Sequence, residues 1–270
     1  MKTLRMIGMA LFAVLMCMNF ASCSSSDDDE PEVDNENGIV TNEKKLISIT
    51  EEYEDDGNLY TYSFAYDNKN RVVSVTTKDY YYGTPKTSIT NIEWDNNLVI
   101  ESRNGEDLTL TLANGRIIKG ESSEEDGCKY SFAYDSSKRL SASEHYHSND
   151  YDNSSCSYSW DNNKLVKYTY TDDYDYEETQ IKYNGQTCKG FFPLWGALVE
   201  DDCYTLLVHP ELVGLRNNYL PSQIIEKYED ITDVCNLAYT FDKDGYIETC
   251  TATTNDGGYI ETVVYTFKWQ

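Results

Sequence analysis

The stretch that decides the fold is Tyr62-Ser63-Phe64-Ala65-Tyr66-Asp67-Asn68-Lys69-Asn70-Arg71-Val72. Its three aromatic rings stand two residues apart, separated by Ser63 and Ala65, so they share one face of an extended strand. Asp67 then opens a turn, because Asp bonds nearby backbone amides and the residues after it tolerate a left-handed backbone. The segment therefore predicts a β-hairpin with an aromatic face inward and a small polar face toward water.

The same pattern recurs along the chain, almost intact at Tyr130-Ser131-Phe132-Ala133-Tyr134-Asp135-Ser136-Ser137-Lys138-Arg139-Leu140. Looser copies have Trp or Phe before the turn residue and run over Ile92–Leu98, Tyr158–Leu165 and Tyr239–Ile247. Two shortened versions turn at Asn114-Gly115 and Asn184-Gly185. Hairpins that stack side by side bury a continuous core that no single copy could bury.

Runs of this kind predict about fifteen strands joined mostly by short turns, which is typical of an antiparallel up-and-down meander. An open sheet of that length curls or closes, so we expect an all-β domain that is strongly curved or barrel-like. Residues 189–218 interrupt the alternation and contain Pro193 and Pro210. We expect a short helix and loops there, which cap one end of the sheet or plug its concave side.

The N-terminal residues indicate export and lipidation. Lys2 and Arg5 precede an apolar stretch that is too short to span a bilayer, and Phe20-Ala21-Ser22-Cys23 forms a lipobox-like cleavage site. We predict a signal peptide at residues 1–22, an acidic disordered spacer at 23–42 and a single repeat-built β domain at 43–270. Acyl chains such as palmitate on Cys23 would anchor the protein to a membrane without a membrane-crossing segment.

Three resemblances extend this interpretation. The run Ser24-Ser25-Ser26-Asp27-Asp28-Asp29-Glu30 after Cys23 resembles the export tag of Bacteroidetes surface lipoproteins, which implies a cell-surface-exposed position on the outer membrane. The alternative is a solvated acidic spacer without an addressing role.

Over most of residues 44–269 the chain resembles a Bacteroidetes family of outer-membrane lipoproteins of unknown function. The resemblance rests on the lipobox, the hairpins, the closing hairpin at Tyr239–Ile247 and the insert ending in Tyr219-Leu220-Pro221-Ser222-Gln223-Ile224. It implies a porin-like fold. The hairpins are also similar to the tyrosine-aspartate repeats of secreted shell-forming toxins, although most copies here lack the regular Gly before Arg. Neither family supplies a catalytic residue.

The formal net charge of −25 at pH 7 disfavours binding to nucleic acid or to an anionic lipid surface. The partners we expect are therefore the membrane, reached through the lipid anchor only, and a glycan or protein ligand.

Of the eight cysteines, Cys17 and Cys23 lie near the N-terminus, which leaves six in the β domain. An even number in an exported protein suits disulfides. We expect Cys188 to pair with Cys203, because they bracket one insert, and Cys235 with Cys250, because they flank one hairpin. The alternative is that some of these residues are buried free thiols.

Exposed aromatic rings are the candidates for ligand binding, because rings stack against the faces of sugars at low entropic cost. The candidates are Tyr80, Tyr81 and Tyr82, which lie among charges, and Phe191, Phe192 and Trp195 of the insert. The alternatives are that β-propensity alone accounts for the tyrosines and that the insert is core.

His145 and His147 are spaced i, i+2 on a predicted strand, so both point to one face and are candidate metal ligands. The alternative is a pair of surface histidines. Acidic turns such as Asp242-Lys243-Asp244-Gly245 resemble calcium loops, but none has the EF-hand spacing and turn chemistry accounts for them. We therefore predict no cofactor.

The sequence contains no Gly-x-Ser-x-Gly elbow, no His-Glu-x-x-His pair and no phosphate-binding loop. Most predicted strands also lack the unbroken apolar face of about ten residues that a lipid-facing strand needs.

We predict a non-enzymatic, surface-exposed lipoprotein that binds an extracellular polymer or host molecule. The alternative is a structural or accessory subunit that docks to another outer-membrane protein. A third is an unidentified hydrolase, because 47 acidic residues leave room for a catalytic carboxylate pair.

Overall fold

The computed structural model describes residues 43–54, 57–80, 85–123, 127–147, 153–192, 203–228, 231–256 and 259–270. The predicted signal peptide, the spacer and Cys23 lie outside these ranges. No helix among the described residues is long and apolar enough to cross a membrane.

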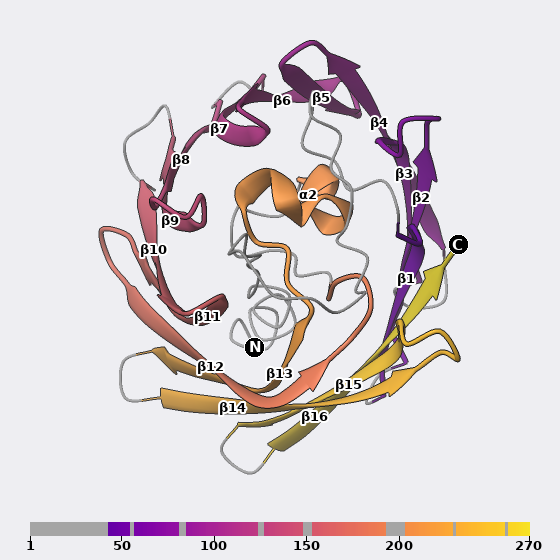
Figure 1. The fold of residues 1–270 in the computed structure, drawn as a ribbon, viewed down its shortest axis with the longest axis vertical. Coiled ribbons are helices and arrows are strands. Elements are labelled where there is room, and N and C mark those ends of the chain that lie inside the picture. Colours follow the sequence, from indigo (N-terminus) through magenta and orange to yellow (C-terminus); the bar gives the residue numbers. More distant parts are fainter. Residues whose placement is uncertain are drawn as a thin grey trace, which may run out of the picture.

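The described residues form sixteen strands that close into one barrel, against the prediction of about fifteen (Figure 1). Each strand pairs antiparallel with the next along the chain, and β1 pairs with β16 to complete the circle. The strands are β1 (Leu46–Tyr53), β2 (Leu59–Tyr66), β3 (Val72–Asp79), β4 (Lys86–Asp95), β5 (Leu98–Arg103), β6 (Glu106–Ala113), β7 (Arg116–Ser122), β8 (Lys129–Tyr134), β9 (Leu140–Tyr146), β10 (Ser154–Asp161), β11 (Lys164–Thr171), β12 (Tyr176–Thr187), β13 (Tyr219–Tyr228), β14 (Ile231–Phe241), β15 (Ile247–Asp256) and β16 (Tyr259–Trp269). The predicted all-β, barrel-like meander is confirmed.

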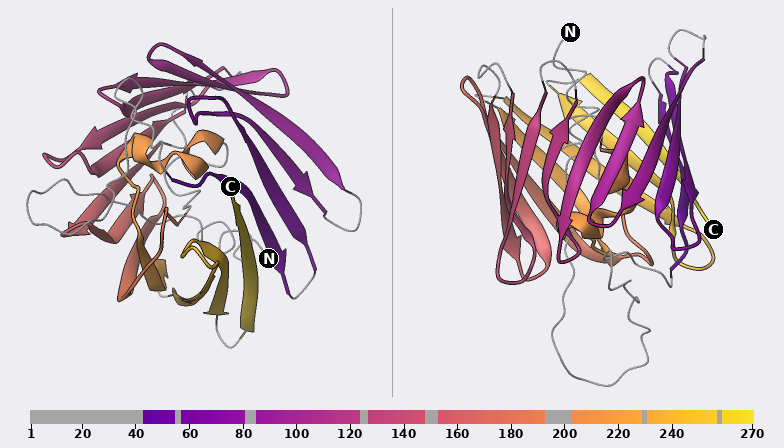
Figure 2. Two further views of the ribbon diagram at one scale, coloured as in Figure 1. Left: turned by 45° about the vertical axis from the view of Figure 1, so that its right-hand side comes forward. Right: turned by 90° about the horizontal axis from the view of Figure 1, so that it is seen from above.

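The two ends of the barrel differ. At one end, which we call the turn end, short turns follow the even-numbered strands and the insert leaves β12. At the other end, which we call the loop end, the connections follow the odd-numbered strands, and the longest of them, residues 147–153, joins β9 to β10. Figure 2 shows the strands tilted between these two ends.

The insert enters the barrel, as predicted. Residues 189–192 and 203–218 of the insert are described. The second segment, Cys203–Asn218, forms the helix α2 (Tyr204–Val208) and the 3₁₀-helix η2 (Pro210–Val213), and we call it the plug. Figure 1 shows α2 inside the ring of strands. Every plug residue from Cys203 to Asn217 is buried, because strands surround it on all sides.

The plug is attached to the inner wall by buried polar contacts. The Glu101 carboxylate on β5 accepts hydrogen bonds from the amides of Tyr204 and Thr205, at 2.9 and 2.7 Å, and so satisfies the first turn of α2. His209 Nε2 accepts the Val72 amide of β3 at 3.1 Å. Since that nitrogen accepts a hydrogen bond, the ring donates from Nδ1 to Glu211, which lies 3.1 Å away.

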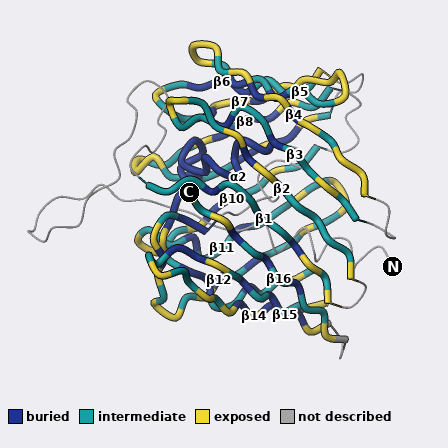
Figure 3. Tube along the Cα trace, turned by 90° about the vertical axis from the view of Figure 1, so that its right-hand side faces the viewer, coloured by how far each residue is buried: buried dark blue, intermediate teal, exposed yellow. Residues whose placement is uncertain are grey.

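Buried and more exposed residues alternate along the strands, as the sequence pattern predicted (Figure 3). Tyr62 and Phe64 of β2 are buried inside, as are Tyr130 and Phe132 of β8. The outer face carries pairs of polar side chains across neighbouring strands, namely Ser131–Glu144, Ser157–Thr169, Gln223–Asn236 and Thr240–Thr249. The core therefore lies within the barrel, and the outer face is largely polar.

The two best copies of the repeat fold identically. Asp67 Oδ1 accepts the amides of Lys69 and Arg71, while its Oδ2 binds the Arg71 guanidinium at 2.7 Å. Asp135 makes the same contacts with Ser137 and Arg139. Asn70 and Lys138 supply the left-handed backbone, with φ of 63° and 60°. These contacts explain why Asp and Arg recur four residues apart.

A ring of aromatic side chains closes the turn end. Seven of the eight even-numbered strands carry, toward their C-terminal end, a Tyr or Trp that donates a hydrogen bond to a carbonyl near the start of the preceding strand. The pairs are Tyr66–Leu46, Trp94–Val72, Tyr134–Ile117, Trp160–Leu140, Tyr183–Leu165, Tyr239–Pro221 and Trp269–Ile247. We call these seven residues the aromatic ring; β6 carries Leu112 instead. Each member joins a hairpin to its neighbour.

We expect Tyr66→Phe and Tyr239→Phe each to lower the free energy of unfolding by about 1 kcal/mol, because each leaves one carbonyl without its hydroxyl donor. The two sites share no partner, so the double variant should lose about the sum. Urea unfolding followed by tryptophan fluorescence measures both effects. Tyr146→Phe, whose ring is exposed on β9, is the control and should change stability by less than about 0.5 kcal/mol. Equal effects at all three positions would show that the aromatic ring contributes nothing specific.

Candidate functional site

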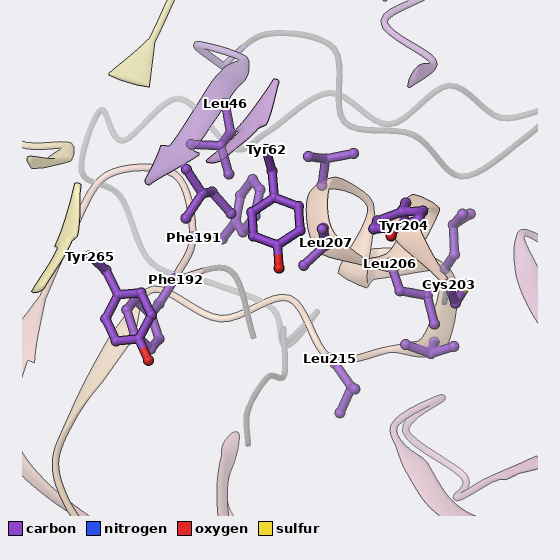
Figure 4. Packing of buried hydrophobic residues seen from close by; sticks show 14 of the residues in the cluster. Leu46, Tyr62, Phe191, Phe192, Cys203, Tyr204, Leu206, Leu207, Leu215 and Tyr265 are labelled. Atoms are coloured by element: carbon purple, nitrogen blue, oxygen red, sulfur yellow. The ribbon is translucent and has the colours of Figure 1, made fainter. Parts of the chain in front are cut away.

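The candidate site is the inner face of the barrel at the loop end, because polar and titratable side chains gather there. Tyr60 of β2, Tyr170 of β11 and Tyr228 of β13 point inward and are half-buried. The turn end is instead filled by the plug and by apolar residues such as Leu207 and Leu212, which are fully buried. Figure 4 shows Leu206, Leu207 and Tyr204 of the plug packed beside Tyr62.

Glu51 is a buried carboxylate enclosed by tyrosines. Its cross-strand neighbours are Tyr60 on β2 and Tyr265 on β16, and only 5% of the residue is exposed. Its Oε1 has no hydrogen-bond partner among the described residues. Burial raises the pKa of Glu51 from 4.5 to about 8, since desolvation disfavours the charged form. The side chain therefore carries a proton at neutral pH.

A second group of carboxylates lies on β12, β13 and β14. Glu226 stands opposite Thr179 on one side and Asp233 on the other, and Glu177 is one inward position from Thr179. Burial, with contributions from the negative charges of Glu177 and Asp233, raises the pKa of Glu226 to about 8. Burial likewise raises the pKa of Glu177, with a contribution from Asp175. This wall of the loop end favours protons or cationic groups.

His145 and His147 both lie on the inner face, as their spacing predicted, and their ring centroids are 4.3 Å apart. The structure adds Cys128, whose Sγ is 3.3 Å from His147 Nδ1. One potential ligand atom from each of the three residues lies within 4.8 Å of the others. The sequence analysis did not include Cys128. The register of β8 and β9 could have identified it, because Lys129 pairs with Tyr146 and the next position outward from the Asp135 turn therefore sets Cys128 opposite His147.

Phe191 and Phe192, two candidates for ligand binding, lie in the core, which agrees with the alternative stated for the insert. Only 3% and 6% of these residues are exposed. The Phe191 ring packs edge-on against Trp269 at 5.4 Å and lies beneath the Arg216 guanidinium at 4.5 Å. The chain re-enters the barrel directly after β12, so both rings join the core (Figure 4). Trp195 lies outside the described residues.

Of the three consecutive tyrosines, only Tyr80 is described. It follows β3 at the loop end, is half-buried, and donates its amide to the Leu59 carbonyl at 3.0 Å. Tyr81 and Tyr82 lie outside the described residues, so their predicted part in binding stays a prediction.

The predicted disulfides are absent, because none of the six described cysteines is bonded to another. Cys235 pairs across strands with Thr254, and Cys250 with Tyr239, which offsets the two cysteines by four residues, about 13 Å along the strands. A disulfide needs Cα atoms within about 7 Å. Cys203 contacts Glu101 on β5, whereas Cys188 stays at the end of β12, where its amide bonds Asn218.

No family model and no curated protein matches the chain. Two solved structures of porin-like proteins are similar to it. One, from Bacteroides uniformis, is 16% identical with a TM-score of 0.63, over 83% of this chain and 98% of that one. The other, from Bacteroides vulgatus, is 13% identical with a TM-score of 0.62, over 84% and 99%.

The chain has the fold of porin-like proteins from Bacteroides. This agrees with the fold that the sequence resemblance implied. At these identities the likeness concerns the fold alone, and function has to be argued from the residues of the site.

We expect Glu51 to make stability fall as pH rises. The folded protein keeps a proton on Glu51 between pH 4.5 and about 8, where the unfolded chain has lost it, so folding is favoured at the acidic side of this window. One such group changes the free energy of unfolding by at most about 1.4 kcal/mol per pH unit. Glu51→Gln should therefore flatten the pH dependence measured by urea unfolding across this window. The control is Glu52→Gln, the exposed neighbour on β1. An unchanged slope in Glu51→Gln would contradict the assignment.

Proposed function

We propose that this protein is a non-enzymatic lipoprotein, anchored through Cys23 on the outer membrane and exposed at the cell surface. In this proposal it captures an extracellular polymer or host molecule at the loop end of its barrel. The observation that carries the proposal is the division of the inner face. One half is filled by the plug, and the other presents half-buried tyrosines and carboxylates toward the loops. The mouths of β-barrels are common ligand sites.

Capture fits the geometry better than conduction. The plug is held by Glu101 on β5 and by the Val72 amide on β3, two separate strands. Within the plug, Arg216 binds Glu211 at 3.2 Å, and although burial opposes ionisation, Arg216 and His209 lower the pKa of Glu211 to about 2. Moving the plug would expose or separate these buried charges, which costs several kcal/mol. A ligand that enters from the loop end would reach the plug before the turn end.

The lipid, rather than the barrel wall, is the proposed attachment to the membrane. Lys119, Glu121 and Lys129 stand on the outer face of β7 and β8, and Lys129 lies 3.2 Å from Glu121. A lipid-facing strand carries an apolar band instead, and charges at its middle cost about 2–4 kcal/mol each. A polar outer face of this kind suits contact with water.

Tyrosine rings are the groups we expect to hold the ligand, since they stack on sugar faces and lose little entropy. The carboxylates Glu177, Glu226 and Asp233 would accept hydrogen bonds from hydroxyl groups or pair with cationic groups. This combination favours a hydroxyl-rich or cationic polymer over an anionic one.

We expect the purified protein to bind one such polymer on a glycan array, with a stoichiometry near one by calorimetry. Tyr60→Ala and Tyr228→Ala should each weaken binding by about five- to tenfold, because a stacked ring contributes on the order of 1 kcal/mol. Tyr146→Ala is the matched control, since that ring is exposed on the outer face of β9, and should leave affinity unchanged.

Equal losses in all three variants would contradict a site at the loop end. Co-purification of an outer-membrane protein, together with no binding on the array, would favour the accessory-subunit alternative instead.

A further inference from the structure

We propose that Cys128, His145 and His147 form a binding site for a single Zn²⁺ ion on the inner wall at the loop end. This goes beyond the proposed capture of a polymer and does not depend on it. Three side chains from two neighbouring strands bring one thiol and two imidazoles together. Thiolate and imidazole are the ligands that Zn²⁺ prefers, whereas hard cations such as Ca²⁺ take oxygen ligands.

The register of one hairpin creates the cluster. Tyr130 of β8 stands opposite His145 of β9, and the next inward position on each strand is Cys128 and His147. Inward positions are two residues apart, so the three side chains stay on the barrel interior, while Tyr146 between the histidines points outward. Two of the three histidines in the chain lie in this cluster.

The distances suit a zinc centre. With Zn–S near 2.3 Å and Zn–N near 2.0–2.1 Å, two ligands of a tetrahedral ion lie about 3.3–3.6 Å apart. The observed 3.3 Å between Cys128 Sγ and His147 Nδ1 falls in this range, and the largest separation in the cluster is no more than 4.8 Å. Small side-chain rotations close that difference.

The surroundings hold the ligands in place. The His145 ring stacks on Tyr130 with centroids 4.6 Å apart and planes 1° from parallel, so its orientation is set by a buried neighbour. The Asn153 side chain accepts the His147 amide at 3.0 Å and ties the end of β9 to the chain entering β10. Preorganised ligands of this kind reduce the entropy lost when a metal binds.

Three protein ligands leave a fourth coordination position. Structural zinc sites usually have four protein ligands, whereas sites with three keep a position for water or for a ligand atom. On the inner face at the loop end, that position is reached from the barrel interior. The metal would thus be a Lewis acid within the wall of the candidate site.

The test uses the purified protein, stripped with a chelator and titrated with Zn²⁺ by calorimetry and with Co²⁺ by absorption. We expect one ion per chain, the visible bands of tetrahedral Co²⁺ and a thiolate-to-cobalt charge-transfer band. Cys128→Ala should abolish the charge-transfer band. His145→Ala and His147→Ala should each weaken Zn²⁺ binding by about 100-fold or more, since even a residue that only orients a ligand contributes about 10- to 100-fold.

Two matched variants serve as controls. Cys235→Ser removes another inward thiol, on β14, and Tyr146→Phe alters the outward residue between the histidines. Both should keep the stoichiometry and the cobalt spectrum. His147→Gln, at the half-buried end of β9, covers the case in which His145→Ala fails to fold.

Thermal unfolding supplies an independent readout. Zn²⁺ at 100 times its Kd should raise the Tm of the wild-type protein by about 5–10 °C and leave the Tm of Cys128→Ala unchanged. The proposal is overturned if no cobalt band forms, if the charge-transfer band persists in Cys128→Ala, or if the controls lose binding equally. Polymer binding on the array is scored separately, so failure of either proposal is visible without the other.

Discussion

The structure depends on the hydrogen bonds that the aromatic ring makes at the turn end. Each Tyr or Trp of the aromatic ring packs its apolar body into the interior and donates its polar tip to the backbone of the preceding strand, as Tyr66 does to Leu46 at 2.6 Å. This geometry buries the apolar ring and also gives the O–H or N–H group the hydrogen-bond partner that a buried Tyr or Trp needs. The turn arginines reinforce it, because Asp67 holds Arg71 and Arg71 lies over the Trp94 ring at 5.6 Å. The same device recurs where Asp135 holds Arg139 over Trp160. One local rule, repeated from hairpin to hairpin, therefore orders the whole circumference.

This rule also explains how much could be predicted from the sequence. Residues two apart must share a face, so the inward position of Tyr62, Phe64 and Tyr66 was predictable, and so was an insert that plugs the sheet. The closing β1–β16 pair was not, because it joins Ile49 to Phe267 and no local pattern fixes that register. The sequence left open whether Phe191 and Phe192 bind a ligand or belong to the core, because apolar side chains look alike in sequence whether they face water or a barrel interior. The predicted disulfide between Cys235 and Cys250 was wrong for a related reason, since the two cysteines flank one hairpin but lie four residues out of register. Cys128 was not predicted as a neighbour of His147, because that contact depends on the exact register of β8 and β9 on either side of the Asp135 turn.

The interior tolerates charge only where a partner or a proton neutralises it. Glu211 stays ionised because Arg216 and His209 contact it within the plug. Glu101 is buried too, and its carboxylate replaces the missing partners of the first amides of α2. In the part of the chain that the structure describes, no cation offsets the burial of Glu51, and its raised pKa keeps it protonated at neutral pH. The first two carboxylates thus have structural roles in fixing the plug. Glu51, together with Glu226 on β13, instead makes the loop end responsive to pH.

The arrangement of apolar and polar faces separates this barrel from a lipid-spanning one with a similar outline. A membrane barrel turns its apolar residues outward and keeps a polar lumen. Here the aromatic residues of the repeated hairpins point inward, and pairs such as Ser157–Thr169 and Thr240–Thr249 lie on the outside. A barrel of sixteen strands encloses more space than the inward side chains of its strands fill, so its apolar inner face needs additional residues to pack against. The plug supplies it at the turn end, through Leu207, Leu212 and Leu215, which are almost completely buried. Toward the loop end the inner face becomes polar, with Tyr228, Glu226 and Asp233 in place of leucines. The plug therefore packs against the apolar inner face at the turn end, while the inner face at the loop end is lined by polar and titratable side chains.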